Sequence, residues 1–258
     1  SITPEPPVPL TGYGVYLDRT APRVLDELRV NTVVIERNGA RWVLACFDLL
    51  GFAPGDAGRL RRRLADVAGT ETTLTTVACT HTHSGPPTAP LRGMPPIAES
   101  YLERVFTAAC EAVGEATAAL HPVTVRYGAK PIEPIGFNRV YGDFSHLDPT
   151  LSVLVLDPDR SGIRPIVLAG YACHPVTLGV NDAVSADYPG VFVRRLGEDG
   201  YDAAFLQGFC GNIDPVVNLD AWGSGDREDV LRYAEHLRYH ARCLIEVAPP
   251  VEWKGPDL

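Results

Sequence analysis

The sequence predicts an α/β domain in which a layered, mixed β-sheet is flanked by helices. Apolar runs of strand length, rich in β-branched residues, alternate along the chain with stretches of helical periodicity. The Asn38-Gly39 pair between two of these runs is a strong hairpin signal, so the sheet should contain an antiparallel pair. The 258 residues are 45% hydrophobic, which is enough for one domain with a substantial core.

The strands are expected where short apolar runs are bounded by turn residues. The first two, at 31–37 and 41–48, flank the Asn38-Gly39 turn. Further runs of the same kind follow at 72–80, 123–128, 151–157, 164–173 and 203–209.

The helices are expected where apolar residues recur at helical spacing. Gly69 closes the first, Pro122 stops the second, and Pro189 lies near the start of the third. The four patterns cover 55–69, 98–120, 187–200 and 227–246. A long loop at 132–148 is rich in Gly, Pro and Asn, and loops of that length in a compact domain are often functional.

Charge and hydropathy exclude several classes of protein. The net charge of −9 argues against a nucleic-acid-binding protein, which needs a dense basic surface. No apolar run reaches about 18 residues, so no membrane span is expected. The first ten residues lack the basic start and apolar core of a signal peptide, which favours a cytoplasmic protein, although a removed signal peptide would leave no trace. The sequence does not indicate an oligomeric state.

The six cysteines form no CxxC pair and are widely spaced, so buried thiols are expected rather than a disulfide framework. A weaker alternative is a cysteine hydrolase that uses Cys79 or Cys173 beside a histidine. Each of these thiols is flanked by apolar residues, which would raise its pKa and disfavour the thiolate.

Polar residues stand where four of the predicted strands end. They are Asp48, the pair His81 and His83, His174, and the pair Asn212 and Asp214. In open α/β sheets the sites gather at strand ends, so these side chains could converge.

The His81-Thr-His83 stretch is the most informative of these strand ends. Side chains at i and i+2 of a strand share a face, roughly 6.5 to 7 Å apart. With His174 from another strand, two or three neutral imidazoles would be available to a zinc ion. Each histidine could instead cap a strand end by bonding to the backbone, but three of them together with strand-end aspartates favour a metal.

Other polar residues near these motifs have a structural reading beside a functional one. Ser84 is more typical of a turn than of a nucleophile. Asp187 could be a helix N-cap or part of a site. Arg139 in the long loop could polarise a substrate carbonyl or be a solvated arginine.

Five ordered segments resemble the neutral/alkaline (non-lysosomal) ceramidase family, specifically its N-terminal catalytic domain. The most specific is "THTHSGP". The others are the "NR" of "GFNRVYGD", "CHPVTLG", "SADYPG" and "FLQGFCGNIDP". The resemblance extends from about Thr3 to about Asn218, and it implies that residues 1–258 form a single catalytic domain with a ceramidase-like fold.

The resemblance implies a zinc-dependent hydrolase that cleaves the N-acyl bond of an amide by metal-activated water. His81 resembles the first zinc ligand of the family and His174 the second. His83 resembles the histidine that contacts the reacting carbonyl, and Arg139 resembles the arginine that stabilises the oxyanion. The predicted site therefore comprises metal ligands His81, His174 and Asp187, catalytic residues His83, Arg139 and Asp214, and substrate-binding residues Ser84, Asn138, Tyr188 and Asn212.

Two departures from the family pattern leave alternatives open. Where ceramidases carry Gly-Asp-x-Ser-Pro with an essential serine, this chain has "GNIDP", with Asp214 at the serine position. The family's remaining zinc ligands, a Glu and a Tyr, lie further along longer chains. Either the chain is truncated, as the strand-like start at 252–258 suggests, or Asp48, Asp187 or Asp214 completes the site. The substrate is expected to be a small-molecule or lipid amide, and the alternatives are an esterase of the same fold or a non-catalytic binding or scaffold domain.

Overall fold

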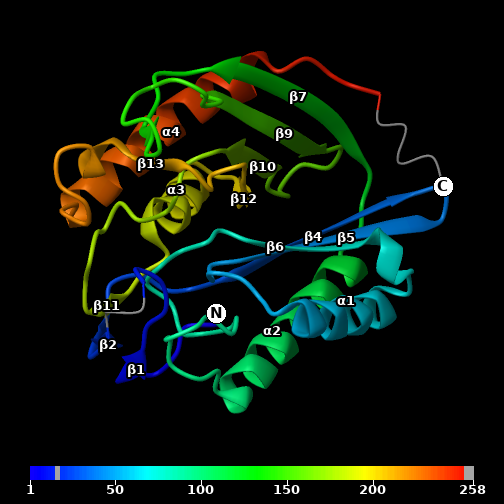
Figure 1. The fold of residues 1–258 in the computed structure, drawn as a ribbon. Helices are drawn as coiled ribbons and strands as arrows, with labels where there is room; N and C mark the ends of the chain where they lie inside the picture. Colours follow the sequence, from blue (N-terminus) through cyan, green and yellow to red (C-terminus); the bar gives the residue numbers. More distant parts are fainter. Residues whose placement is uncertain (15–17, 253–258) are drawn as a thin grey trace.

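The computed structural model describes residues 1–14 and 18–252. Its described part is built on two principal sheets (Figure 1). The three-stranded sheet contains, in spatial order, β4 (Val30–Arg37), β5 (Ala40–Phe47) and β6 (Thr75–Cys79). The four-stranded sheet contains β12 (Asp202–Gln207), β10 (Ile166–Tyr171), β9 (Thr150–Pro158) and β7 (Val123–Pro131). Both sheets are mixed, because β5–β6 and β10–β12 are parallel pairs and the other pairs are antiparallel.

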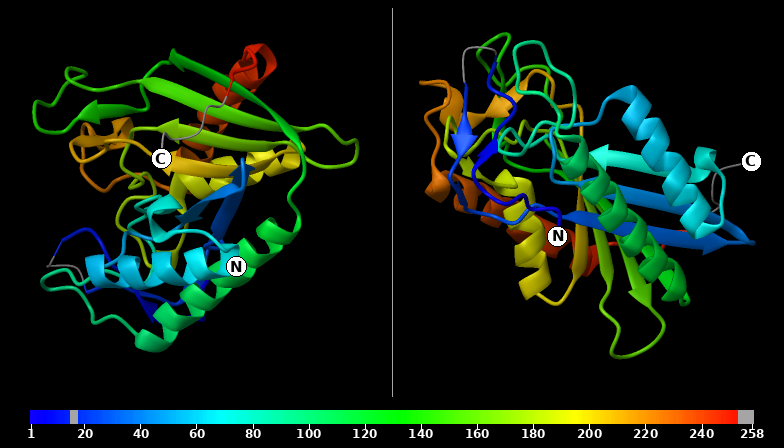
Figure 2. Two further views of the ribbon diagram at one scale, coloured as in Figure 1. Left: turned by 90° about the vertical axis from the view of Figure 1, so that its right-hand side faces the viewer. Right: turned by 90° about the horizontal axis from the view of Figure 1, so that it is seen from below.

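Helices cover the outer face of each sheet, and the inner faces pack on each other (Figure 2). The helices of the three-stranded side are α1 (Pro54–Ala68) and α2 (Glu99–Ala118), and those of the four-stranded side are α3 (Asp187–Glu198) and α4 (Arg227–Val247). Alternation along each strand produces this layering. In β4, for example, Val33 lies in the core between the sheets and Val34 packs under the helices.

The predicted α/β class is confirmed, and the strands and helices predicted within the described residues are present. Asn38 and Gly39 both have positive φ, at 53° and 81°, and pair Arg37 with Ala40 across the turn. These are the dihedrals of a two-residue type I′ hairpin. The difference from expectation is that the strands form two sheets. Strands such as β4 carry apolar residues on both faces, so the sequence pattern cannot assign them to one sheet.

Local chemistry sets the ends of several helices. Gly69 ends α1 in the left-handed conformation, with φ 64°. Asp226 is the N-cap of α4 and forms a capping box with Asp229. The Asp226 carboxylate accepts from the backbone N–H of Asp229, and the Asp229 carboxylate accepts from the backbone N–H of Asp226. Asp187 is the first residue of α3 rather than its N-cap, which is Ala186.

The loop predicted at 132–148 contains a short strand, β8 (Gly136–Asn138), paired with β13 (Ile213–Pro215). This antiparallel pair places the "GFNR" segment directly beside "GNIDP". Two further small sheets pair β1 (Val8–Pro9) with β2 (Thr20–Ala21), and β3 (Arg23–Val24) with β11 (Ala183–Val184). Short 3₁₀ turns occur at Thr72–Leu74 and Val216–Asn218.

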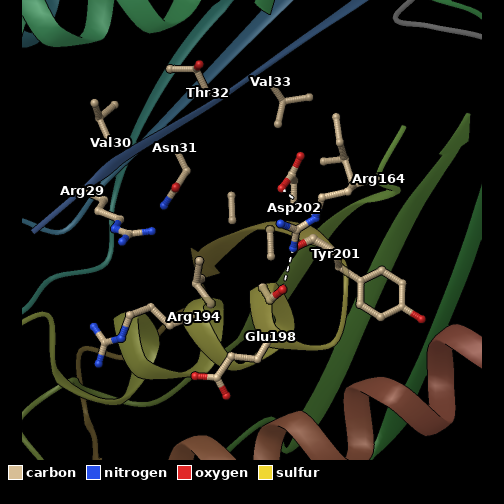
Figure 3. A pocket seen from close by; sticks show the side chains of 15 residues that line it. Arg29, Val30, Asn31, Thr32, Val33, Arg164, Arg194, Glu198, Tyr201 and Asp202 are labelled. Carbon is tan, nitrogen blue, oxygen red and sulfur yellow. Dashed lines mark hydrogen bonds and ion pairs between the residues drawn. The ribbon is translucent and has the colours of Figure 1, made fainter. Parts of the chain in front are cut away.

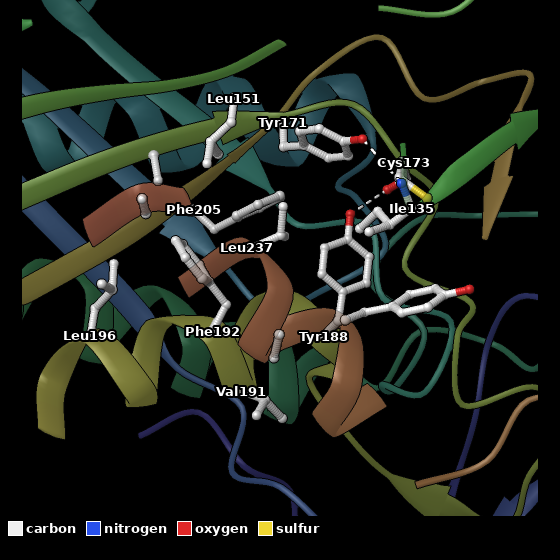
Figure 4. Close-up of a cluster of buried hydrophobic side chains, with 14 of the residues drawn as sticks. Ile135, Leu151, Tyr171, Cys173, Tyr188, Val191, Phe192, Leu196, Phe205 and Leu237 are labelled. Carbon is white, nitrogen blue, oxygen red and sulfur yellow. Dashed lines mark hydrogen bonds between the residues drawn. The ribbon is translucent and has the colours of Figure 1, made fainter. Parts of the chain in front are cut away.

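The core of the four-stranded half is rich in aromatic rings (Figure 4). Tyr188 and Phe192 of α3 pack edge-on against Phe205 of β12, with ring centroids 5.8 and 6.0 Å away. Among the described residues, no helix combines the length and apolarity needed to cross a bilayer. The strand start predicted at 252–258 falls almost wholly at 253–258, outside the described residues.

Candidate metal centre

Three histidines from two strand ends meet in one cluster. His81 and His83 follow β6, and His174 follows β10. The ring centroids of His81 and His174 are 4.9 Å apart, and those of His83 lie 5.1 Å from His81 and 5.4 Å from His174. One ring nitrogen from each lies within 4.8 Å of the others, a spacing that one metal ion could bridge.

Backbone carbonyls orient two of these rings. Nδ1 of His81 lies 2.8 Å from the carbonyl oxygen of Leu50, and Nδ1 of His174 lies 2.7 Å from that of Cys210. A carbonyl can only accept, so each Nδ1 carries the proton and each Nε2 keeps its lone pair. Metal-ligating histidines are held in this way, with the distal nitrogen donating to a carbonyl or carboxylate. The residues present therefore fit a divalent ion.

His83 differs from the other two rings. Its Nδ1 accepts a hydrogen bond of 3.3 Å from the backbone N–H of Tyr13. Its Nε2 is buried and has no partner among the described residues. The third ring is thus held by a donor, whereas the other two are held by acceptors.

Burial favours the uncharged form of two of these rings, His83 and His174. It lowers the pKa of His174 to about 4, with a further contribution from His81. It also places the pKa of His83 well below the ordinary value, and the charge of Arg139 acts in the same direction. Neutral imidazole is the form that binds metal, so the environment favours ligation at neutral pH.

Asp187, the predicted third ligand, lies outside the cluster of possible ligand atoms. It has φ 53°, and its carboxylate accepts from the backbone N–H groups of Leu178 (3.0 Å) and Tyr188 (2.6 Å). Burial raises its pKa to about 6, while these backbone hydrogen bonds act against the shift. In the described part of the chain the cluster contains three imidazoles and no carboxylate, so the role of Asp187 as a ligand stays a prediction.

Arg139 and Asp214 form an ion pair across the β8–β13 pair. Nη1 of Arg139 lies 3.2 Å from Oδ1 of Asp214, and Nη2 donates to the carbonyl of Gly211 at 2.6 Å. The carboxylate is buried, with 3% of its side chain exposed, whereas 44% of the arginine is exposed. Burial raises the pKa of Asp214, and Arg139 opposes that rise. The guanidinium is therefore anchored on one side and open to an incoming ligand on the other.

Two of the predicted substrate-binding residues are engaged in turns. Oγ of Ser84 accepts from the side-chain amide of Asn181 at 2.9 Å. The buried Asn138 donates to the carbonyl of Ser145 and accepts from the N–H of Val140, at 3.2 and 3.0 Å. Both side chains hold loops that surround the cluster, and their contact with a substrate stays a prediction.

The other two predicted substrate residues lie in different surroundings. Tyr188 is fully buried in the aromatic core, and its hydroxyl donates to the carbonyl of Cys173 at 2.6 Å (Figure 4). Asn212 is partly exposed, and its carbonyl accepts from the N–H of Arg139 at 2.9 Å. The structure brings Asn212 to the site through Arg139 and places Tyr188 in the core.

Sequence reasoning missed an aromatic wall beside the histidines. The ring of Tyr13 lies edge-on to His83 and Trp222, with centroids 5.2 and 5.6 Å away, and the guanidinium of Arg19 lies 4.6 Å from its centre. Burial raises the pKa of Tyr13, and its hydroxyl has no partner among the described residues. The available signal was the "GYG" stretch, in which Gly12, Tyr13 and Gly14 all have positive φ.

The structure disfavours a cysteine nucleophile. The six cysteines are free thiols. Burial raises the pKa of both Cys79 and Cys173. A thiol in such surroundings does not supply the thiolate that nucleophilic catalysis needs.

A cavity of about 620 Å³ lies away from the histidines, between the start of β4, α3 and β12 (Figure 3). Its three arginines already have carboxylate partners. Arg29 pairs with Glu27, Arg164 with Asp202, and Arg194 with Asp26. Its cations are therefore already paired with carboxylates, whereas the Nε2 of His83 in the histidine cluster has no partner among the described residues.

Comparison with known proteins identifies structures of similar fold. No family model and no curated protein matches the chain. Among solved structures, "Ceramidase complexed with C2" matches with a TM-score of 0.80 and 21% identity over 95% of this chain and 42% of that chain. Neutral ceramidase from Pseudomonas aeruginosa matches with a TM-score of 0.80 and 22% identity over 95% and 43%.

These two matches establish the fold of the chain. The chain is a mixed α/β domain with histidines at the strand ends, and its fold is that of a neutral ceramidase domain, as the sequence motifs predicted. It spans less than half the length of the ceramidases that it matches.

Proposed function

We propose that this domain is a metal-dependent hydrolase that cleaves the N-acyl amide bond of a lipid or small molecule. The observation that carries the proposal is the pair His81 and His174, whose Nδ1 atoms both donate to carbonyls and whose rings lie 4.9 Å apart. The neutral ceramidase fold supports the choice of an amide bond over other acyl bonds.

His81 and His174 are the residues that would hold the ion, and Asp187 is the candidate to join them. The lone pairs of two neutral imidazoles suit zinc. A zinc ion there would supply a water of lowered pKa and a Lewis acid for the carbonyl. A site made of two or three protein ligands keeps the open position that catalysis requires.

His83 and Arg139 are our candidates to bind the oxygen of the reacting carbonyl. The Nε2 of His83 is buried without a partner, and the guanidinium of Arg139 remains partly exposed. Donors fixed before the reaction stabilise a developing oxyanion most effectively in a site with little water. Asp214 holds Arg139 in place and, as the only carboxylate paired with it here among the described residues, is our candidate for the general base.

The surroundings of the site favour an apolar acyl chain. Four large apolar side chains near the site residues in the sequence are at least half exposed. They are Val140 (68%), Tyr141 (65%), Phe209 (99%) and Trp222 (50%). We call these four residues the apolar rim. Val140 and Tyr141 follow Arg139, Phe209 precedes Cys210, and Trp222 contacts Tyr13, so each adjoins a residue of the site or its surroundings. Exposed apolar groups can mark binding sites for apolar partners.

Metal analysis and a panel of N-acyl amides with matched esters test the proposal together. The wild-type protein should bind close to one zinc per chain and hydrolyse an amide, and a chelator should abolish the reaction. His81→Ala and His174→Ala should each lose both metal and activity. The matched control is His121→Ala, which removes an exposed imidazole outside the cluster.

Three outcomes would overturn the proposal. Substoichiometric metal in the wild type, with no hydrolysis of any amide, would indicate a binding or scaffold domain. Hydrolysis that survives both histidine substitutions would show that the reaction does not use the cluster. Hydrolysis of the esters with no hydrolysis of any matched amide would assign the site to an esterase instead.

A further inference from the structure

We infer that the Gly12–Tyr13 turn is a positioning device for His83. It fixes the proton of that imidazole on Nε2, so that the cluster presents two lone pairs and one N–H donor. The catalytic role that we give to this N–H donor rests on the proposed function. The position of the proton can be measured without a substrate.

The three rings are not equivalent, because their Nδ1 atoms have opposite kinds of partner. The carbonyls of Leu50 and Cys210 accept from His81 and His174, which therefore carry the proton on Nδ1. The N–H of Tyr13 donates to His83, whose Nδ1 must then be the unprotonated nitrogen. In a neutral imidazole the proton of His83 consequently lies on Nε2.

The Nε2 of His83 is a donor that lacks an acceptor in the described part of the chain. It is buried and makes no hydrogen bond there. An unsatisfied buried donor costs free energy, and native structures retain few of them without a ligand to accept. The acceptor that the proposed function supplies is the carbonyl oxygen of the substrate.

Only glycine fits at position 12. Its φ is +89°, and a Cβ there would lie 2.6 Å from the Cβ and Cγ of His83 and 2.7 Å from its Nδ1. Approaches that close do not occur between real side chains. Because Gly12 has no side chain, the backbone can approach the imidazole of His83 closely, and the N–H of Tyr13 can donate to it.

Arg19 clamps the turn and the histidine together. Its Nη2 donates to the carbonyl of Thr11, just before the turn, at 2.7 Å, and also to the carbonyl of His83. Its guanidinium stacks on the ring of Tyr13. The buried Arg19 side chain thus contacts both the segment that supplies the Tyr13 N–H donor and the segment that carries the accepting His83 ring.

The proton positions of the histidines can be read by ¹⁵N NMR at pH 8, which lies above the ordinary pKa of imidazole, about 6.5. In the wild-type protein, His81 and His174 should appear as Nδ1–H tautomers and His83 as the Nε2–H tautomer. The chain contains seven histidines, so assignment by single His→Gln variants is practical. A wild-type His83 protonated on Nδ1 would overturn the inference outright.

Gly12→Ala tests the turn, and Gly39→Ala is its matched control. Both glycines have φ above +80°, but a Cβ at Gly39 would meet nothing within 4 Å. Gly12→Ala should mix the two tautomers of His83 and lower kcat at least about tenfold, with zinc stoichiometry unchanged, because a donor to the oxyanion is lost. Gly39→Ala should carry the same backbone strain and change neither the tautomer nor kcat.

Two further variants guard against misfolding and separate the hypotheses. Tyr13→Phe keeps the backbone N–H, so His83 should stay in the Nε2–H form. Arg19→Gln should loosen the turn and mix the tautomers even if Gly12→Ala does not fold, and an unchanged His83 in that variant would contradict the clamp. If the wild type shows the expected tautomers but neither zinc nor hydrolysis, the proposed function fails and the positioning of His83 stands.

Discussion

Two buried polar clusters in this molecule have opposite hydrogen-bonding states. The carboxylate of Asp26 is fully buried and is surrounded by donors, namely Ser185, Arg194 and Arg227. The histidine cluster is also buried or partly buried, yet the Nε2 of His83 has no partner among the described residues. Asp26 is saturated by the protein itself, whereas the histidines leave a donor and two lone pairs directed at one another.

The difference teaches which buried polar groups serve the fold and which await a ligand. Asp26 lies just after β3, while Arg194 is in α3 and Arg227 begins α4, so this ion cluster joins separate segments. A group that the chain satisfies completely stabilises one arrangement of those segments. A cluster that the chain leaves open is tolerated where an external partner completes it.

The largest expected effect comes from removing the carboxylate of the saturated cluster. Asp26→Ala leaves two arginines and a serine without their acceptor, and we expect a loss of about 3 kcal/mol, the lower end for breaking a buried ion pair because both arginines are partly exposed. Urea unfolding at pH 7 measures it. The control is Asp182→Ala, whose pair with Arg23 is mostly exposed and should contribute less than about 1 kcal/mol.

The comparison would break if the two aspartate variants unfolded at the same denaturant concentration. That result would mean that saturation of Asp26 adds nothing to stability. A loss of zinc from Asp26→Ala while it remains folded would instead couple the ion cluster to the histidines.

Asp48 sharpens the comparison because it is a buried carboxylate held by the backbone. It accepts from the N–H of Arg29 at 3.0 Å, and burial raises its pKa from 3.8 to about 7. Between those values the folded protein keeps a proton that the unfolded chain has lost. The free energy of unfolding should therefore fall as the pH rises from about 4 to about 8, by on the order of 4 kcal/mol.

Asp48→Asn should remove most of this pH dependence, because the amide keeps an acceptor oxygen and cannot ionise. We expect the variant to be more stable than the wild type at pH 8 and to lose that advantage near pH 4. Urea titrations across this range measure the effect, with Asp182→Asn as the exposed control. Parallel stability profiles for wild type and Asp48→Asn would show that Asp48 ionises at its ordinary pKa.

Substitutions of Arg139 test whether the histidine cluster and its neighbours act on a substrate. Arg139→Ala should lower kcat about 100-fold, as removal of one oxyanion donor does, while zinc remains bound. Arg139→Lys should recover only part of the rate, because lysine lacks the planar fork. Arg164→Ala, from the cavity of Figure 3, is the matched control and should retain full activity. Equal rates for the two alanine variants would remove Arg139 from the reaction.

The elements that the sequence predicted well are those set by local chemistry. The Asn38-Gly39 hairpin and the Gly69 helix end follow from residues that tolerate positive φ. The division into two sheets was not predictable, because it depends on which inner faces pack together. Leu156 of β9 and Val33 of β4 meet in the core between the sheets although they are far apart in the chain.

The sequence predicted which histidines gather at the site, but it did not predict the contacts that orient them. His81, His83 and His174 are polar residues at the ends of apolar strands, where a core function does not explain them. The Tyr13 N–H reaches His83 across 70 positions of sequence and through a turn of positive φ. Nothing in the pattern around Tyr13 specifies that contact, because tertiary packing creates it.

Tyr188 gives the smallest expected effect and the sharpest separation of core from site. Its hydroxyl donates to the carbonyl of Cys173, which also accepts from the side-chain amide of Gln207 at 2.6 Å. Tyr188→Phe keeps the ring in the aromatic core and leaves that carbonyl satisfied, so the cost in unfolding free energy should be about 1 kcal/mol. Because the ring is fully buried, kcat and KM should stay within about twofold of wild type in the amide assay. A large rise in KM without a loss of stability would return Tyr188 to the substrate site that its motif predicted. It would also show that a residue saturated by the fold can still contact the ligand.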